Sequence, residues 1–187
     1  MDCSCQKLEG GMALDLRYPV GKFQWDGNPT EESRRRAIED IAAAPTKVRA
    51  ALQGLTPAQI DTPYRPEGWT VRQVVHHIAD SHMNAFIRFR LALTENEPTI
   101  KPYDENLWSQ LADSRELDPA VSLELLEPLH QRWLALLRSM KPTDFARTLN
   151  HPESGVGSLD RTLAMYAWHG KHHVAHITSL RERKGWK

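Results

Sequence analysis

The segment "WHGKHHVAHI", residues 168–177, holds four of the nine histidines in the chain. Imidazole is the commonest protein ligand for zinc, nickel and copper, and it titrates near neutral pH. His169 and His173 are four residues apart, so on a helix they lie one turn apart on the same face. The two histidines of the HExxH zinc enzymes have this spacing. The segment therefore raises the hypothesis of a metal site.

The apolar residues around this segment indicate which histidines face inward. At about 100° of rotation per residue, one face of the helix collects Leu159, Met165, Tyr166, Ile177 and Leu180. His169 and His173 lie closest to the middle of that face, and His172 lies at its edge. The alternative is that these histidines are ordinary polar residues, hydrogen-bonded to water or to carbonyl groups. A third histidine from another helix would favour a catalytic metal site, because three protein ligands leave a coordination position open.

The segment "VVHHIADSH" offers three candidates for that third ligand: His76, His77 and His82. His82 lies nearer than His77 to the apolar face of its helix. His77 instead begins a polar stripe, which continues through Ser81, Asn84 and Arg88. This stripe is either a solvated face or one wall of a polar pocket, in which Arg88 would bind an anionic substrate group. Periodicity alone leaves the third ligand open.

Four segments have the composition and the end signals of long helices. They cover residues 30–55, 68–95, 119–140 and 158–184. Thr70 and Gln73 have the spacing of a capping box at the start of the second helix. Pro45 should kink or split the first helix, and Pro128 should interrupt the third. No segment alternates with a period of two between hairpin turns, so we expect an all-α domain.

The lengths of the helices and their connections predict a four-helix bundle. The connection between the second and third helices, about 22 residues, is long enough to cross the bundle. Residues 1–29 contain aromatic residues, glycine and proline without a helical period, so we expect an irregular N-terminal arm there. Residues 30–187 then form the single bundle domain.

Composition restricts the class of protein. Lysine plus arginine equals aspartate plus glutamate, at 24 each, so no net charge attracts nucleic acid or an anionic membrane. The only cysteines, Cys3 and Cys5, are too close together for an ordinary disulfide, which suits a reducing cytoplasm. No apolar run approaches the roughly 20 residues of a membrane helix, and a signal peptide is not evident. We therefore expect a soluble cytoplasmic protein.

Three segments together resemble the YfiT-type branch of the DinB superfamily: "PYRPEGWTVRQVVHHIADSHMNAFIRFRLALTE", "KPYDENLWSQL" and "YAWHGKHHVAHITSLRERKGW". The resemblance extends from "YPVGKF" to the C-terminus. It implies a four-helix bundle in up-down-down-up order that holds one divalent metal ion. The ligands implied are His77 from the second helix and His169 and His173 from the last. The helical wheel selects the last two independently, whereas His77 rests on the resemblance alone.

The resemblance also implies an activity. Related proteins are metal-dependent hydrolases, or transferases that join a low-molecular-weight thiol such as bacillithiol, mycothiol or glutathione to an electrophile. Three neutral imidazoles leave the ion its full positive charge, so it lowers the pKa of a bound water or thiol. We expect zinc first and nickel second, a small-molecule substrate, and a homodimer. The alternative is a non-catalytic, metal-bearing bundle that binds a small molecule or a partner.

The sequence does not identify the general base that a hydrolase needs. The glutamate of an HExxH motif is missing, because Gly170 follows His169. The candidates elsewhere are Asp80, Asp104 and Glu105. Each of these also fits a surface or capping carboxylate, so the base stays unassigned.

A dinuclear iron site is the other metal centre common in helical bundles. Glu127 and His130 have its Glu-x-x-His spacing. The motif occurs only once, with Pro128 inside it, whereas such a site requires two copies. We therefore reject this interpretation.

Overall fold

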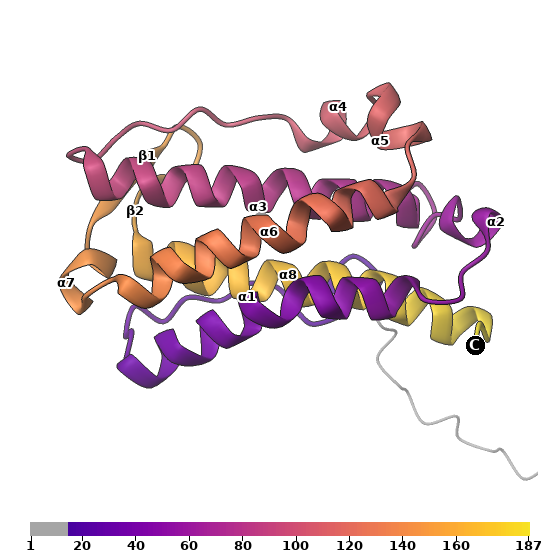
Figure 1. Ribbon diagram of the computed structural model, residues 1–187, viewed down its shortest axis with the longest axis horizontal. Helices are drawn as coiled ribbons and strands as arrows, with labels where there is room; N and C mark the ends of the chain where they lie inside the picture. The colour runs from indigo at the N-terminus through magenta and orange to yellow at the C-terminus, as the bar shows by residue number, and fades with distance from the viewer. Residues whose placement is uncertain (1–14) are drawn as a thin grey trace, which may run out of the picture.

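The computed structural model describes residues 15–187, in which four long helices pack side by side (Figure 1). The long helices are α1 (Glu31–Leu52), α3 (Val71–Thr94), α6 (Pro119–Ser139) and α8 (Leu159–Lys184). The shorter elements are α2 (Pro57–Ile60), α4 (Glu105–Ser109), α5 (Ala112–Glu116), α7 (Pro142–Phe145), β1 (Thr148–His151) and β2 (Gly155–Ser158). The prediction of a four-helix bundle is confirmed.

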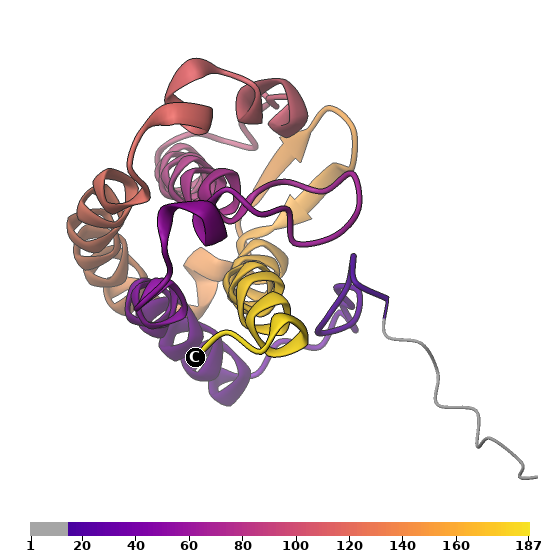
Figure 2. The same cartoon turned by 90° about the vertical axis from the view of Figure 1, so that its right-hand side faces the viewer.

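The direction of the helices follows from the long crossover between α3 and α6. Residues 95–118 return along the length of the bundle and contain α4 and α5 (Figure 1). As a result α3 and α6 run parallel to each other and opposite to α1 and α8, in the predicted up-down-down-up order. Each long helix packs against two others, α1 and α3 both lying between α6 and α8 (Figure 2).

Local sequence signals set the ends of the long helices. The predicted capping box of α3 is confirmed: Thr70 Oγ1 accepts from the Gln73 N–H at 3.2 Å, and Gln73 Oε1 accepts from the Thr70 N–H at 2.9 Å. The Asp118 carboxylate accepts from the Ala120 N–H at 2.8 Å and caps α6. Gly185, with φ of 64°, ends α8 in the left-handed conformation that favours glycine.

The two helices that contain an interior proline are both continuous, so the predicted split at Pro45 and interruption at Pro128 are wrong. Proline cannot bond to the carbonyl four residues before it. For Pro45 that carbonyl belongs to Ile41, and it accepts a hydrogen bond from His130 instead. Pro128 and Glu124, four residues before it, both lie on the exposed side of α6, where water can replace the missing bond.

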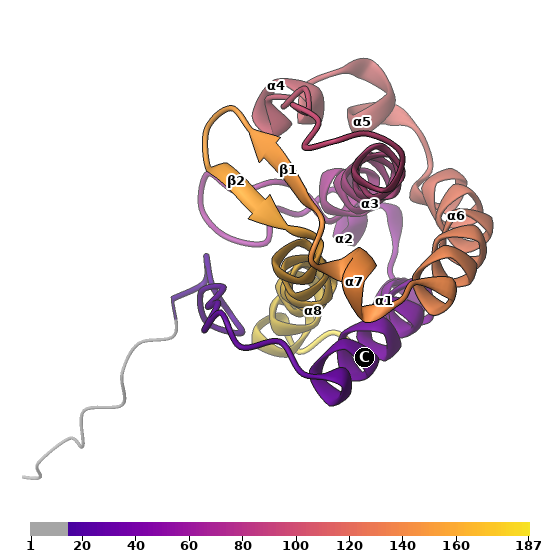
Figure 3. The ribbon, with the colours of Figure 1, turned by 90° about the vertical axis from the view of Figure 1, so that its left-hand side faces the viewer.

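A short antiparallel hairpin was not expected from the sequence. Strands β1 and β2 pair with Thr148 opposite Ser158 and His151 opposite Gly155. Four-residue strands with two glycines in β2 are too short for a recognisable alternation. The hairpin packs β1 against α3 and β2 against α8 (Figure 3). The hairpin therefore lies against the two helices that carry the predicted metal ligands.

The bundle interior consists of two apolar clusters. One includes Phe89, Trp133 and Tyr166, and the other includes Ile78, Leu126 and Ile177. Helices α3, α6 and α8 also carry histidines whose rings contact one another within the bundle. We call His77, His82, His130, His169 and His173 the histidine layer. His82 and His130 are buried there, so their ring nitrogens require partners inside the protein.

Residues 15–30 contain neither helix nor strand and pack on α8. His176 Nε2 donates to the Arg17 carbonyl at 3.2 Å, and Trp168 Nε1 donates to the Gly21 carbonyl at 3.1 Å. Cys3 and Cys5 lie outside the described residues. Within residues 15–187, no helix combines the length and the apolar character needed to cross a membrane.

Candidate metal centre

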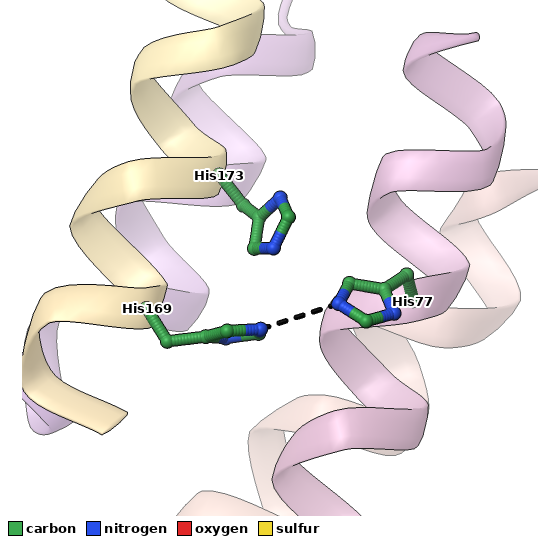
Figure 4. A group of neighbouring side chains, drawn as sticks. All are labelled: His77, His169 and His173. Carbon is green, nitrogen blue, oxygen red and sulfur yellow. Dashed lines mark hydrogen bonds between the residues drawn. The ribbon is translucent and has the colours of Figure 1, made fainter. Parts of the chain in front are cut away.

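Three histidines from two helices meet in the histidine layer (Figure 4). His77 comes from α3, and His169 and His173 come from successive turns of α8. His77 Nε2 and His169 Nε2 are 3.2 Å apart, and one ring nitrogen from each of the three residues lies within 4.8 Å of the other two. The structure thus brings together all three residues that the sequence analysis selected as ligands.

An aromatic side chain covers one side of the three rings. His173 is 7% exposed, as its place on the apolar face predicts, and His77 is half-buried. The Trp69 ring covers one side, with centroids 4.7 Å from His77 and 6.3 Å from His173. Trp69 directly precedes the capping residue of α3, so the same local turn that starts the helix also shields the site.

Burial keeps the three imidazoles neutral at pH 7. Burial, followed by the neighbouring His172 and His176, lowers the pKa of His77 to about 4. Burial also holds the pKa values of His169 and His173 well below the usual range, with smaller contributions from adjacent imidazoles. Metal binding requires the neutral form, because only a deprotonated ring nitrogen offers a lone pair.

A cavity of about 320 Å³ opens beside the three histidines. Its polar lining includes Ser81, Arg88, Tyr103, Glu105, His151 and Glu153. Ser81 Oγ lies 3.4 Å from His169 Nε2, so the cavity reaches the candidate ligands directly. Its size falls in the range of small-molecule sites.

Arg88 is the cationic side chain of this cavity. Its Nη1 donates to the Tyr166 hydroxyl at 3.2 Å, and within residues 15–187 it forms no ion pair with a carboxylate. Burial raises the pKa of Tyr103 to about 12, so its hydroxyl keeps its proton at pH 7. The polar stripe of α3 therefore lines a pocket at Ser81 and Arg88, while Asn84 bonds back to the Asp80 carbonyl.

The other histidines of α3 have different partners. His82 is completely buried; its Nδ1 lies 2.8 Å from His130 Nε2, and its Nε2 lies 3.3 Å from His169 Nδ1. His76 faces α6, and its Nε2 donates to the Leu117 carbonyl at 3.0 Å. His82 therefore contacts a candidate ligand, whereas His76 does not reach the cluster.

A second group of three histidines shares His173. One ring nitrogen of His172, His173 and His176 also lies within 4.8 Å of the other two. His172, expected at the edge of the apolar face, is buried. Burial, then His172, and to a smaller extent the positive charges of Arg65 and Arg183 lower the pKa of His176 to about 4. These arginines also oppose a bound cation, so the group from two helices is the stronger candidate.

The candidate bases differ in position. The Asp104 carboxylate caps α4, where it accepts two backbone N–H bonds at 2.9 Å. Burial, followed by the charge of Asp113, raises the pKa of Asp80 to about 6, but Asp80 does not line the cavity. Glu105 does line it, together with Glu153, which the sequence analysis missed. Glu153 follows β1, so the unexpected hairpin carries it to the site.

Comparison with known protein families gives a match that covers most of the bundle. The model described as the DinB superfamily matches residues 40–177. The chain belongs to the DinB superfamily. His77, His169 and His173 all lie within the matched segment.

Two relatives in this superfamily match nearly their whole length. One, from Bacillus mycoides (strain KBAB4), is 55% identical over 172 residues, which cover 92% of this chain and 99% of the relative. Another, from Bacillus cereus (strain 03BB102), is 54% identical with the same coverage. Both are named "Putative metal-dependent hydrolase".

Solved structures give the same result. YfiT from Bacillus subtilis, described as "a probable metal-dependent hydrolase with an unusual four-helix bundle topology", superposes with a TM-score of 0.90. It is 48% identical, and the match covers 92% of this chain and 99% of that one. The four-helix bundle protein TT2238 has a TM-score of 0.54 at 18% identity, covering 78% of this chain and 98% of that one. That second likeness concerns the fold alone.

Proposed function

We propose that this DinB-superfamily member is a metal-dependent enzyme in which His77, His169 and His173 hold one divalent ion. The observation that carries the proposal is the meeting of these three neutral imidazoles beside a cavity. Three nitrogen ligands from two helices suit zinc first and nickel second, and they leave a position open for a substrate or water. The names of the relatives support a metal-dependent hydrolase.

The cavity residues supply the remaining functions. When bound, the ion lowers the pKa of a water or thiol and so provides a nucleophile at neutral pH. Arg88, which has no carboxylate partner within residues 15–187, binds an anionic group of the substrate. The Tyr103 hydroxyl donates a hydrogen bond to the substrate. Glu105 or Glu153 accepts the proton that water releases.

A thiol transferase is the second candidate for the same site. It is favoured by the residue after His169: Gly170 stands there, so the glutamate base of the HExxH enzymes is missing from α8. A thiol has a pKa near 8.5, far below that of water, and needs less help from a base. In this reaction a low-molecular-weight thiol takes the place of water as the nucleophile.

The test is a screen with untagged, zinc-loaded protein. One arm follows loss of a simple electrophile with and without bacillithiol, mycothiol or glutathione; the other follows cleavage of ester and amide substrates. Thiol-dependent consumption would identify a transferase, and thiol-independent cleavage a hydrolase. Activity that survives both chelation and the His169→Ala substitution would overturn the metal-dependent mechanism. Zinc binding without turnover in either arm would favour a metal-bearing binding protein.

We further propose that the protein acts on a small molecule in the cytoplasm as a homodimer, without nucleic-acid or membrane partners. The cavity volume and the balanced charge support the substrate class, and the resemblance to YfiT-type proteins supports the dimer. Light scattering of the full-length protein tests the dimer directly.

A further inference from the structure

A chain of hydrogen bonds connects His169 with the backbone of α1. His169 Nδ1 lies 3.3 Å from His82 Nε2, and His82 Nδ1 lies 2.8 Å from His130 Nε2. His130 Nδ1 in turn lies 2.9 Å from the Ile41 carbonyl oxygen. His82 is 0% exposed and His130 is 2% exposed, so these contacts form inside the bundle. The chain uses side chains or backbone from all four long helices.

The donor and the acceptor of every hydrogen bond follow from the group that ends the chain, the Ile41 carbonyl. The Ile41 carbonyl can only accept, so His130 Nδ1 must carry a proton and donate it. A neutral His130 then offers the lone pair of Nε2, which accepts from His82 Nδ1. By the same step, His82 Nε2 accepts from His169 Nδ1. His169 is left with the lone pair of Nε2, and this is the atom that faces His77 at 3.2 Å.

Each ring must be neutral for this sequence to hold. A buried imidazolium without a carboxylate partner is costly, and the hydrogen-bond partners of His82 and His130 are imidazoles and a carbonyl group. Burial lowers the pKa of His130 to about 4, in agreement with a single proton on this ring at pH 7.

Pro45 explains why the Ile41 carbonyl is available. In a regular helix this oxygen would accept the N–H of residue 45, but proline has none. The proline therefore frees one carbonyl in the interior of α1, and His130 donates to it. The proline does not break the helix but provides the fixed end of the hydrogen-bond chain.

We propose that His82 and His130 are positioning residues that orient His169 and hold its Nε2 lone pair toward the metal site. This inference rests on the proposed metal centre and adds two residues that support it. Partners of this kind commonly change metal affinity by about 10- to 100-fold. Because the partners are neutral imidazoles instead of a carboxylate, they orient the ligand without adding negative charge to the site.

The first test measures the proton positions in metal-free, full-length protein. Nitrogen-15 NMR of histidine-labelled wild type distinguishes a protonated ring nitrogen from one with a free lone pair. We expect Nδ1–H with unprotonated Nε2 at His169, His82 and His130. A protonated Nε2 at His169, or an even mixture of tautomers there, would overturn the proposal. This readout requires neither metal nor activity.

The second test measures zinc affinity by competition with a chromogenic chelator. His82→Leu removes the acceptor for His169 and should weaken zinc binding by about 10- to 100-fold. His82→Gln keeps an acceptor oxygen and should recover part of that loss. Wild-type affinity in a folded His82→Leu protein would contradict the proposal. If that variant does not fold, the tautomers of the wild type still decide.

His76→Leu is the matched control. His76 is a buried histidine on the same helix with two hydrogen bonds, one to the Leu117 carbonyl and one to Ser122 Oγ, but it lies outside the chain. We expect it to lower stability and leave zinc affinity unchanged. If the proposed ligands were wrong, His169→Ala would retain zinc. If only the positioning role were wrong, His82→Leu would bind zinc with wild-type affinity, and His169→Ala would still lose it.

Discussion

The two groups of three histidines that share His173 have similar nitrogen separations but different surroundings. The first group, His77, His169 and His173, joins two helices and borders a cavity. The second group, His172, His173 and His176, comes from one helix. Its outer rings are covered by aromatic residues: Trp168 stacks on His172 at 4.4 Å, and Tyr64 stacks on His176 at 3.9 Å.

Proximity of ring nitrogens is therefore not sufficient for a metal site. Ligands from two helices approach an ion from different directions, as tetrahedral geometry requires. His172 and His173 are consecutive on α8 and diverge by about 100°. An imidazole stacked on an aromatic ring acts as a flat packing group with a polar edge. We therefore assign the first group to chemistry and the second to packing of the N-terminal arm and α8.

The largest expected effect separates the two groups directly. His77→Ala and His169→Ala should each lose nearly all bound zinc, because two protein ligands remain. His176→Ala should keep about one zinc per chain. Elemental analysis of untagged protein after dialysis measures the stoichiometry. Zinc retained by His169→Ala, or lost from a folded His176→Ala, would reverse the assignment of the two groups.

The cavity beside the first group gives the next effect. Arg88→Leu should raise KM for an anionic substrate by about 10- to 100-fold, because a hydrogen bond to a charged group contributes about 1.5–3 kcal/mol. KM for a neutral analogue should change little. Arg90→Leu, an exposed neighbour on the same helix, serves as the control. Equal losses for anionic and neutral substrates would argue against an anion-binding role.

Acid sensitivity tests the packing role of the second group. The folded pKa of His176 is about 4 and the ordinary histidine pKa is 6.5, so the unfolded chain binds more protons between these pH values. Stability must then fall as pH falls from 7 to 5, by about 2 kcal/mol from this residue. His176→Phe keeps a ring against Tyr64 without the titration. Urea unfolding of zinc-loaded protein at both pH values measures the free energy of unfolding. Between pH 7 and pH 5 it should fall less in the variant than in the wild type, and an equal decrease would contradict the packing role.

A change at Pro45, where the hydrogen-bond chain ends, should have the weakest effect: stability rises slightly and zinc affinity falls slightly. Pro45→Ala restores an N–H that can bond to the Ile41 carbonyl, which His130 now uses. We expect the free energy of unfolding to rise by about 1 kcal/mol, the net contribution of one hydrogen bond. Zinc affinity should fall only a few-fold, because the carbonyl oxygen has a second lone pair. Thermal unfolding and chelator competition measure the two effects. Zinc affinity that rises together with stability would argue against the role of this carbonyl.

Several features of the protein were determined by the sequence alone, because they depend on neighbours within one or two turns. The capping box of Thr70 and Gln73 sets the start of α3. The four-residue spacing of His169 and His173 places them on one face of α8. The four helices and the long crossover followed from similar local signals, whereas the up-down-down-up order came from the family resemblance.

The roles of the polar stripe of α3, the two prolines and the remaining histidines depend on contacts between helices. His77 and His169 are far apart in the chain, and their contact depends on how α3 packs on α8. The apolar period of α3 could not rank His82 against His77, because both nitrogens of His82 find partners on other helices. Periodicity reports which side of a helix is buried. It does not report which group from a distant segment contacts that side. Such contacts distinguish a metal ligand from a residue that positions the ligand.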